Sequence, residues 1–450
     1  MPIMNWSQLM STVRFRPNEN GEIQMPTPKA DKQTDPFRSD FHVDYDRLVF
    51  SNAFRRLGRK TQVHPLARND HTHNRLTHSV EVSSVGRSLG NKVGGMLAIN
   101  GKLPEHISPA DLGMVVQVAC LAHDLGNPPF GHTGEDALRT WFRQPEHAVY
   151  LTSLNEAQRN DVQTYEGNAH SLRQVVNLKM YRHRGGMRLT AASIGALLKY
   201  PWTSTHPNGR TKFNVYQTEL PYLRHVAAEL GLPEIAPNTW ARHPLSYLME
   251  AADDICYALM DLEDAIDLGL LDYREVENIM SHLVSTEITW QAHNTQERTA
   301  MMRGLAIGRA IDDVAQTFMR HHNDLLDGQF KGKDLLDLCS EDVQTTLAEA
   351  KKLARERIYR HRSKLIHELA AFPCLASMLN LLVPAAHAFL SGQNVSTQQS
   401  LALDLLDSNP ILPSDSLYQA YMKILDYIGG MTDNYAAQTA RELSGVGMVS

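Results

Sequence analysis

Residues 122–135 read Ala-His-Asp-Leu-Gly-Asn-Pro-Pro-Phe-Gly-His-Thr-Gly-Glu. The apolar run before them predicts a helix that begins after Pro109 and ends near Gly126, because the following Asn-Pro-Pro cannot continue it. At the end of that helix, the side chains of His123 and Asp124 can both turn toward one cation. A chain with 21 histidines would contain such a dipeptide by chance. The dipeptide alone therefore predicts a surface or structural role at least as well as metal binding.

Two other apolar helices carry side chains that could complete a metal site. His78 lies on a predicted helix whose apolar stripe runs through Val82, and Asp253 lies within one predicted from Pro244 to Leu268. A carboxylate inside an apolar helix is costly unless a nearby charge compensates it. Two imidazoles and two carboxylates suit Mn²⁺, Fe²⁺, Co²⁺ or Zn²⁺, and Mg²⁺ less well. We therefore expect one divalent cation on four ligands: His78, His123, Asp124 and Asp253.

The acidic residues around Asp253 have a second interpretation, an exposed stripe that continues through Glu263 and Asp267. Asp253, Tyr257 and Asp261 recur every four residues, which on a helix places them on one line. Such a line can run from a metal along a bound ligand. It would equally suit a core helix with one buried tyrosine.

The remaining pattern predicts an all-α fold, since helical periodicity dominates and alternating strand patterns are scarce. Residues 1–40 are polar and rich in Pro, Asn and Lys, and we expect an extended, poorly ordered arm there. A variable section of about 180–245 contains a break at Arg184-Gly185-Gly186 and a loop at 203–211, which we expect to be mobile. The chain past 275 is again helical, and we expect the region 276–450 to pack on the core.

The most apolar stretch is Ala370–Leu390, which Pro373, Asn380, Pro384 and His387 interrupt. It predicts a buried helix and its neighbour rather than a membrane span. The net charge of −6 and pI of about 6.4 argue against a strongly basic nucleic-acid-coating protein, though not against a local basic patch. The four cysteines form no CxxC pair, and the N-terminus has no signal-peptide pattern. We expect reduced thiols and a cytoplasmic protein without membrane contact.

Several blocks of the chain together resemble the deoxyguanosinetriphosphate triphosphohydrolases and their dNTPase relatives, a branch of the HD superfamily marked by His…His-Asp…Asp. The most specific block is 122–135. The others follow in family order over about residues 40–270: 54–63 (FRRLGRKTQV), 75–79 (RLTHS), 166–169 (EGNA), 198–202 (LKYPW) and 251–255 (AADDI). The C-terminal third matches weakly, through 355–359. Family members often carry Gln after EGNA, and here the residue is His170, which bears on the hydrogen bonding around Asn168.

The resemblance implies an HD-domain helical core over 41–275. It also implies a reaction in which water attacks the α-phosphorus of a dNTP and releases deoxynucleoside and tripolyphosphate. The 5′-oxygen is a poor leaving group and needs a proton donor. The resemblance gives that role to His132 and makes Glu135 the residue that holds it or tunes its pKa. Both residues would also suit a simple capping role at the next helix.

The substrate contacts follow from the same resemblance. Arg75, about one turn before His78, is expected to bind phosphate, and Tyr257 to stack on the deoxyribose and leave no space for a 2′-hydroxyl. Asp261 and Gln62 are expected to bind the 3′-hydroxyl. The remaining candidates for substrate contacts are Asn168, Arg355 and Tyr359. Arg355 and Tyr359 are expected on the base and phosphate side. Lys199 and Lys212 are further candidates for binding phosphate, although Lys212 would equally be an ordinary surface lysine. Arg55 and Arg56 could bind phosphate, form an oligomer contact or line a regulatory pocket.

The family also implies partners: a dNTP substrate with dGTP as the default, dNTP or single-stranded DNA as effectors, and a homo-oligomer, a hexamer by resemblance. Two other functions remain open. Another HD phosphohydrolase, such as a 5′-nucleotidase or phosphodiesterase, would use the same ligands. A nucleotide-sensing or DNA-binding module would keep them with vestigial activity. The sequence selects neither the base nor the metal among Mn, Mg, Co, Fe and Zn.

Overall fold

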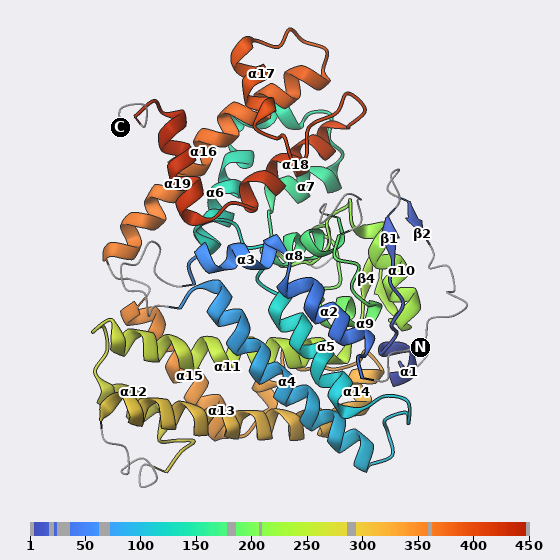
Figure 1. The fold of residues 1–450 in the computed structure, drawn as a ribbon, viewed down its shortest axis with the longest axis vertical. Helices are drawn as coiled ribbons and strands as arrows, with labels where there is room; N and C mark the ends of the chain where they lie inside the picture. Colours follow the sequence, from blue (N-terminus) through green and yellow to red (C-terminus); the bar gives the residue numbers. More distant parts are fainter. Residues whose placement is uncertain are drawn as a thin grey trace.

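The computed structural model describes residues 4–17, 22–24, 37–62, 73–177, 186–206, 209–285, 294–358 and 362–446. Helices dominate these residues, which confirms the all-α prediction. The strands among them form two short antiparallel hairpins, β1 (Arg16–Pro17) with β2 (Ile23–Gln24) and β3 (Glu234–Ala236) with β4 (Thr239–Trp240). The buried apolar side chains form two cores, and the helices divide into two groups accordingly (Figure 1).

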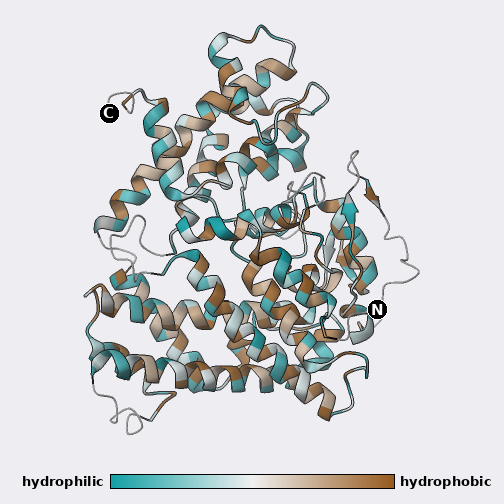
Figure 2. Cartoon of the chain, in the orientation of Figure 1, coloured by the Kyte–Doolittle hydropathy of each residue, from teal (hydrophilic) through white to brown (hydrophobic). Residues whose placement is uncertain are grey.

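The first core occupies the lower part of Figure 1 and is built around three long helices, α4 (Arg75–Ile99), α5 (Pro109–Ala122) and α11 (Pro244–Asp267). The sequence predicted all three, and brown predominates on the central α5 in Figure 2 because its side chains are almost all apolar. Around them pack α1 (Trp6–Leu9), α2 (Asp40–Val49), α9 (Ala191–Leu197), α10 (Leu220–Leu230), α12 (Tyr273–Met280), α13 (Thr295–Arg320), α14 (His322–Leu326) and α15 (Glu341–Leu353).

The second core lies in the upper part of Figure 1 and joins the middle of the chain to its C-terminal region. Its members are α6 (Gly131–Arg143), the 3₁₀ helix η2 (Pro145–Leu151), α7 (Glu156–Gln163), α16 (Arg362–Leu390), α17 (Thr397–Asp404), α18 (Leu417–Gly429) and α19 (Asp433–Leu443). Helix α16 packs against α6, α17, α18 and α19. The helices past residue 275 therefore divide between the two cores.

Short elements lie where the two cores meet. Helix α8 (Gly167–Val176) belongs to both, because Ala169 is buried in the second core and Leu172 in the first. Helix α3 (Asn52–Arg56) and the 3₁₀ turn η1 (Leu57–Arg59) precede α4. Two further short elements, η4 (Leu336–Leu338) and η5 (Ala354–Ile358), pack in the first core. Residues 203–206 and 209–211 of the predicted mobile loop are not helical, and residues 184 and 185 of the other break lie outside the described residues.

The two helices at the centre of the first core approach each other closely. A Cβ atom on Gly90 of α4 would lie 2.7 Å from the Cα of Gly113 on α5, and one on Gly94 would lie 2.7 Å from the Cα of Pro109. Glycines at this spacing face one side of the helix. Their missing side chains therefore let the two backbones meet.

The N-terminal residues differ from the prediction. Residues 4–17 do not form a poorly ordered arm. Met4, Trp6 and Phe15 are buried in the first core, and the Trp6 indole Nε1 donates to His322 Nε2 at 3.1 Å. The polar composition of the whole segment concealed these few apolar anchors. The domain boundaries expected near residues 40 and 275 remain a prediction.

The apolar stretch 370–390 also differs, because it forms one helix and not a helix with its neighbour. Pro373 and Pro384 lie inside the continuous α16. An interior proline costs one helical hydrogen bond and adds a clash with the preceding turn. Burial of side chains such as Leu375, Leu379 and Val383 in the second core offsets that cost. Among the described residues α16 is also long and apolar enough to span a membrane by length and composition alone, and 44% of that apolar stretch is buried inside the molecule.

Candidate metal centre and active site

Three of the four predicted metal ligands meet in the first core. His78 on α4, His123 directly after α5 and Asp253 on α11 each offer one ligand atom, and these atoms lie within 4.8 Å of one another. Asp253 Oδ1 is 3.1 Å from His78 Nε2 and 3.4 Å from His123 Nε2. The contact between α4 and α5 brings the two imidazoles together, with ring centroids 5.7 Å apart.

Asp124, the fourth predicted ligand, lies beside this group but has other partners. Its Oδ1 is 3.5 Å from His123 Nε2. Its Oδ2 accepts from Arg75 Nη1 at 2.8 Å, and its Oδ1 accepts from the side-chain amide of Asn127. Arg75, expected to bind phosphate, is therefore ion-paired to a candidate ligand. The role of Asp124 on the metal remains a prediction.

The chemistry of the three-residue group fits a divalent cation. His123 Nδ1 lies 2.6 Å from the carbonyl oxygen of Cys120 and can donate to it, which leaves Nε2 for a metal. Burial lowers the pKa of His123, but the carboxylates of Asp124 and Asp253 outweigh this and raise it to about 9. Burial likewise raises the pKa of Asp253, whereas His123 and His78 bring it well below its usual value. A cation could replace the protons that now balance these carboxylates.

The expected proton donor, His132, lies in the first turn of α6. His132 is 78% exposed, and its Nδ1 is 3.1 Å from Oε2 of the buried Glu135. Glu135 Oε1 accepts from the backbone N–H of Gly167 at 2.7 Å. Burial raises the pKa of Glu135, but the hydrogen bond from His132 and the charge of His132 outweigh this effect, so the pKa lies below its usual value. The imidazole is thus held at one nitrogen, and the other is left for a ligand.

Two residues beside this pair were given no role from the sequence, although Glu166 lies in the block 166–169 that carries the resemblance. Arg139, one turn after Glu135, donates to Glu135 Oε2 at 3.3 Å and to Glu166 Oε2 at 3.4 Å. Glu166 is buried, and burial together with the charge of Glu135 raises its pKa. The i, i+4 spacing of Glu135 and Arg139 was a usable signal. The link to Glu166 depends on how α6 meets α8, which the sequence does not encode locally.

The hydrogen bonds of Asn168 run to Glu166, whose Oε1 accepts from its side-chain amide at 2.6 Å. The backbone carbonyl of Asn168 accepts from Asn214 Nδ2 at 3.0 Å. His170 lies elsewhere, buried against Tyr165 and 3.8 Å from Asp426 Oδ1. The departure from the family at His170 therefore leaves these bonds of Asn168 intact.

The residues expected around the sugar lie on α11 and at the end of the segment 37–62. Tyr257 and Asp261 follow Asp253 along α11, with Tyr257 half-buried and Asp261 buried. Gln62 has a buried Oε1 without a hydrogen-bond partner among the described residues, which leaves it available for a ligand hydroxyl. Arg355 is exposed in η5, and Tyr359 lies outside the described residues.

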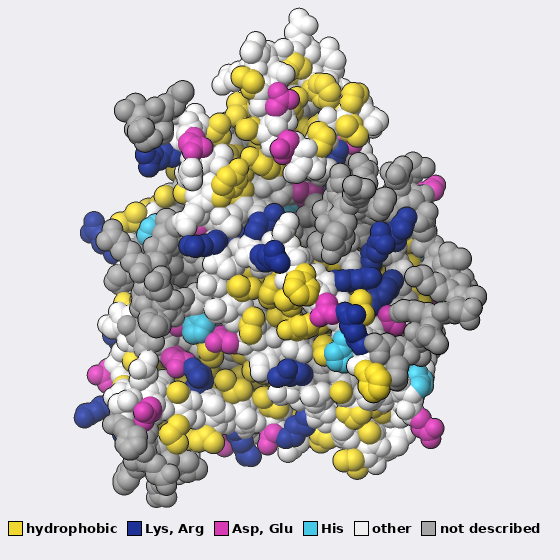
Figure 3. All heavy atoms as spheres, in the orientation of Figure 1, with side chains coloured by type: hydrophobic (Ala, Val, Ile, Leu, Met, Phe, Trp, Pro, Cys, Tyr) yellow, Lys and Arg dark blue, Asp and Glu magenta, His cyan; other side chains and the backbone are white. Residues whose placement is uncertain are grey.

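The two predicted lysines have protein partners. Lys199 Nζ is 3.1 Å from Glu250 Oε1, and Lys212 Nζ is 3.3 Å from Glu166 Oε2. Burial lowers the pKa of Lys199, but Glu250 raises it by more. On the face drawn in Figure 3, Lys and Arg side chains gather over α3, where Arg55 is exposed.

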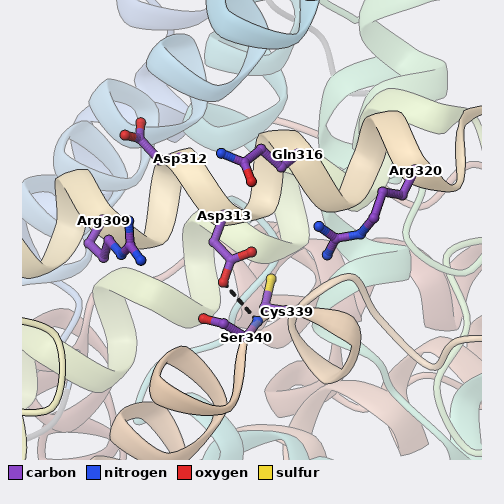
Figure 4. Close-up of a pocket in the computed structure, with 7 residues that line it drawn as sticks. All are labelled: Arg309, Asp312, Asp313, Gln316, Arg320, Cys339 and Ser340. Atoms are coloured by element: carbon purple, nitrogen blue, oxygen red, sulfur yellow. Dashed lines mark hydrogen bonds between the residues drawn. The ribbon is translucent and has the colours of Figure 1, made fainter.

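Two cavities in the described part of the chain lie away from these residues. One of about 280 Å³ lies between α13 and the start of α15, with Arg309 and Arg320 at its two ends (Figure 4). Asp313 accepts there from the backbone N–H of Ser340 at 2.7 Å. A second, of about 300 Å³, lies between α6, η2 and α7. Neither is lined by a predicted site residue.

Most of the chain is similar in sequence to known proteins. The family model described as HD domain matches residues 75–200. A deoxyguanosinetriphosphate triphosphohydrolase-like protein of Pseudomonas aeruginosa is 46% identical over 418 residues, 91% of this chain and 94% of that protein. One of Synechocystis sp. is 34% identical over 99% of this chain and 100% of its own. A deoxyguanosinetriphosphate triphosphohydrolase of Salmonella paratyphi A is 30% identical over 97% and 100%.

Proposed function

The chain belongs to the deoxyguanosinetriphosphate triphosphohydrolase-like family of HD-domain proteins, and from this premise we propose that it hydrolyses dNTPs to deoxynucleoside and tripolyphosphate. It is an HD phosphohydrolase related to dGTPases. The observation that carries the finer proposal is the meeting of His78, His123 and Asp253. It is joined by the imidazole of His132, which the buried Glu135 holds at the start of α6.

Each candidate side chain would have one role in this reaction. A divalent cation, which an HD domain implies, would polarise the α-phosphate and lower the pKa of a water. His132, held at Nδ1 by Glu135, would give a proton from Nε2 to the leaving 5′-oxygen. Arg75 would attract phosphate oxygens, and Gln62 would bind the 3′-hydroxyl. Asp261 would bind the same 3′-hydroxyl, and Tyr257 would stack on the sugar and leave no space for the 2′-hydroxyl of a ribonucleotide.

The finer assignments rest on the family. We propose dGTP as the default substrate, one Mn, Mg, Co, Fe or Zn ion per site, and Asp124 as its fourth ligand. Asn168, Arg355 and Tyr359 complete the proposed substrate contacts. Regulation by dNTPs or single-stranded DNA, a homo-hexamer and a cytoplasmic location belong to the same proposal, as does a core at 41–275 with a C-terminal region at 276–450.

The test is product analysis with each of the four dNTPs, alone and in pairs, in H₂¹⁸O with Mn²⁺. We expect tripolyphosphate that carries the ¹⁸O label and unlabelled deoxynucleoside, because water attacks phosphorus. Release of pyrophosphate or orthophosphate, or hydrolysis of monophosphates or cyclic nucleotides alone, would indicate another HD phosphohydrolase. Four intact dNTPs in every mixture would favour a nucleotide-sensing module.

Removal of one candidate ligand tests the metal centre itself. We expect Asp253→Asn to lose bound Mn²⁺, measured by metal analysis of the dialysed protein, and to lower kcat/KM by at least roughly a hundredfold. The matched control is Glu263→Gln, which removes a carboxylate on the same helix that is ion-paired to Arg303. Equal metal content in the two variants would contradict the assignment.

A further inference from the structure

The proposed site lies at the boundary between the two cores. The helices that carry His78, His123 and Asp253 pack in the first core, whereas α6, which carries His132, packs in the second with α16. Figure 1 shows these groups one above the other, with α3 and α8 between them. The position of His132 relative to the candidate ligands therefore depends on what holds the two cores together.

One buried carboxylate from the C-terminal region bridges two segments of the site. Asp433, the first residue of α19, is 2% exposed. Its Oδ1 accepts from the backbone N–H of Phe130, and its Oδ2 from that of Thr61, both at 2.9 Å. Phe130 is two residues before His132, and Thr61 precedes Gln62. A single side chain thus reaches the segments that carry the proposed acid and a proposed sugar contact.

The turn that Asp433 holds has an unfavourable backbone conformation. Phe130 immediately precedes α6 and has φ +65°, in the left-handed region that residues other than glycine seldom adopt. Such a conformation persists where surrounding contacts determine it. The hydrogen bond from the Phe130 N–H to Asp433 is such a contact, and it comes from a residue 303 positions away in the chain.

A buried lysine makes a second connection at the same place. Lys60 is 2% exposed, and its Nζ donates to the carbonyl of Asn127 at 2.5 Å and to that of Gly429 at 2.7 Å. Asn127 begins the turn that ends at Phe130, and Gly429 is the last residue of α18. The turn is therefore held at both ends by contacts that involve the C-terminal region.

We propose that Asp433 and Lys60 are positioning residues, which fix the turn 127–130 and through it place His132 against the metal centre. The C-terminal helices α18 and α19 are then part of the working site. This inference rests on the proposed role of His132 as the acid. It predicts that loss of these contacts impairs the chemical step more than substrate binding, since a misplaced donor acts on the transition state.

The experiment compares Asp433→Asn, which keeps one acceptor oxygen, and Asp433→Ala, which keeps none, with Asp415→Asn as the matched control. Asp415 lies in the same region, and its carboxylate accepts from Leu412 N–H at 2.7 Å and from Lys423 at 2.5 Å. Two measurements are made: amide hydrogen exchange over 60–62 and 127–136, and steady-state kinetics on the dNTP that the wild type hydrolyses. Lys60→Met is measured in the same way.

We expect faster exchange at Phe130 and Thr61 in both Asp433 variants, largest in Asp433→Ala, and faster exchange over 127–130 in Lys60→Met. We expect kcat to fall about tenfold or more with a smaller change in KM, while Asp415→Asn matches the wild type in both measurements. Wild-type exchange and kcat in Asp433→Ala would overturn the proposal. If the wild type releases no tripolyphosphate, the proposed function fails, and the exchange measurement still decides whether Asp433 holds the turn.

Discussion

His73 lies between two carboxylates that belong to the ligand-bearing helices. Its Nδ1 contacts Asp264 on α11, and its Nε2 is 3.0 Å from Glu81 on α4. The hydrogen bonds to Asp264 and Glu81 raise the pKa of His73 to about 10, against the opposing effect of burial. A charged imidazole therefore joins α4 to α11 near the candidate metal centre.

This interaction predicts a dependence of stability on pH. Because the folded chain holds the His73 proton up to about pH 10 and an unfolded chain releases it near pH 6.5, the stabilisation is complete below about 6.5 and is lost as the pH rises through about 10. We expect His73→Gln to lower Tm most at pH 6, with a gap to the wild type that narrows steadily toward pH 10. Scanning calorimetry over that range measures it, and a gap of constant size would contradict the prediction.

At the same scale, the sequence could select those candidate residues whose signal is local. His78, His123 and Asp253 could be selected because each is a polar group on an apolar helix, and the structure brings them together. The pairing of Asp124 with Arg75 could not be predicted, since it depends on how α4 and α5 face each other. Asp433 gave no signal at all, because its partners are 303 and 372 residues away.

Among the elements, the close contact of α4 and α5 fixes the spacing of His78 and His123. At Gly90 an added Cβ would meet backbone atoms of Leu112 and Gly113 at 2.7 Å, and backbone cannot move aside as a flexible side chain can. Gly95, on the same helix, has no heavy atom within 4 Å of such a Cβ. The two glycines therefore separate the effect of packing from that of helix propensity.

We expect Gly90→Ala to lose about 1–3 kcal/mol of unfolding free energy and to bind Mn²⁺ more weakly, because the helices must move apart. Gly95→Ala should gain roughly 0.5–1 kcal/mol by removing a flexible glycine from a helix. Thermal unfolding and metal titration measure both. Equal behaviour of the two variants would show that the helix contact does not set the ligand spacing.

The helices themselves were predictable where apolar periodicity was strong, as for α11, which ends at Asp267. The prediction was wrong for α16, because local proline rules count the lost hydrogen bond at Pro373 and Pro384 but not the burial that the whole fold supplies. It was wrong for residues 4–17 for the same reason, since α1 is only four residues long and its burial depends on distant partners.

For the whole molecule, the N-terminal residues are expected to contribute to global stability. Trp6 is 4% exposed and contacts His322 of α14, more than 300 residues later. We expect Trp6→Ala to cost about 3–5 kcal/mol of unfolding free energy, measured by denaturant titration. Ile99→Ala, at a side chain that is 88% exposed, should change it by less than about 0.5 kcal/mol. A similar small change in both would mean that the N-terminal residues are not anchored in solution.

The second core has a consequence for the order in which the protein is made. Helix α6 ends at Arg143 and its partner α16 begins at Arg362, so 218 residues (144–361) are synthesised between them. At about 5–20 residues per second, a ribosome needs on the order of tens of seconds for that interval. During it, the apolar face of α6, with Leu138 and Phe142, has no α16 to cover it. A nascent chain that has not yet reached Arg362 therefore leaves this apolar face open to other contacts, and the half of the candidate site that carries His132 is completed last.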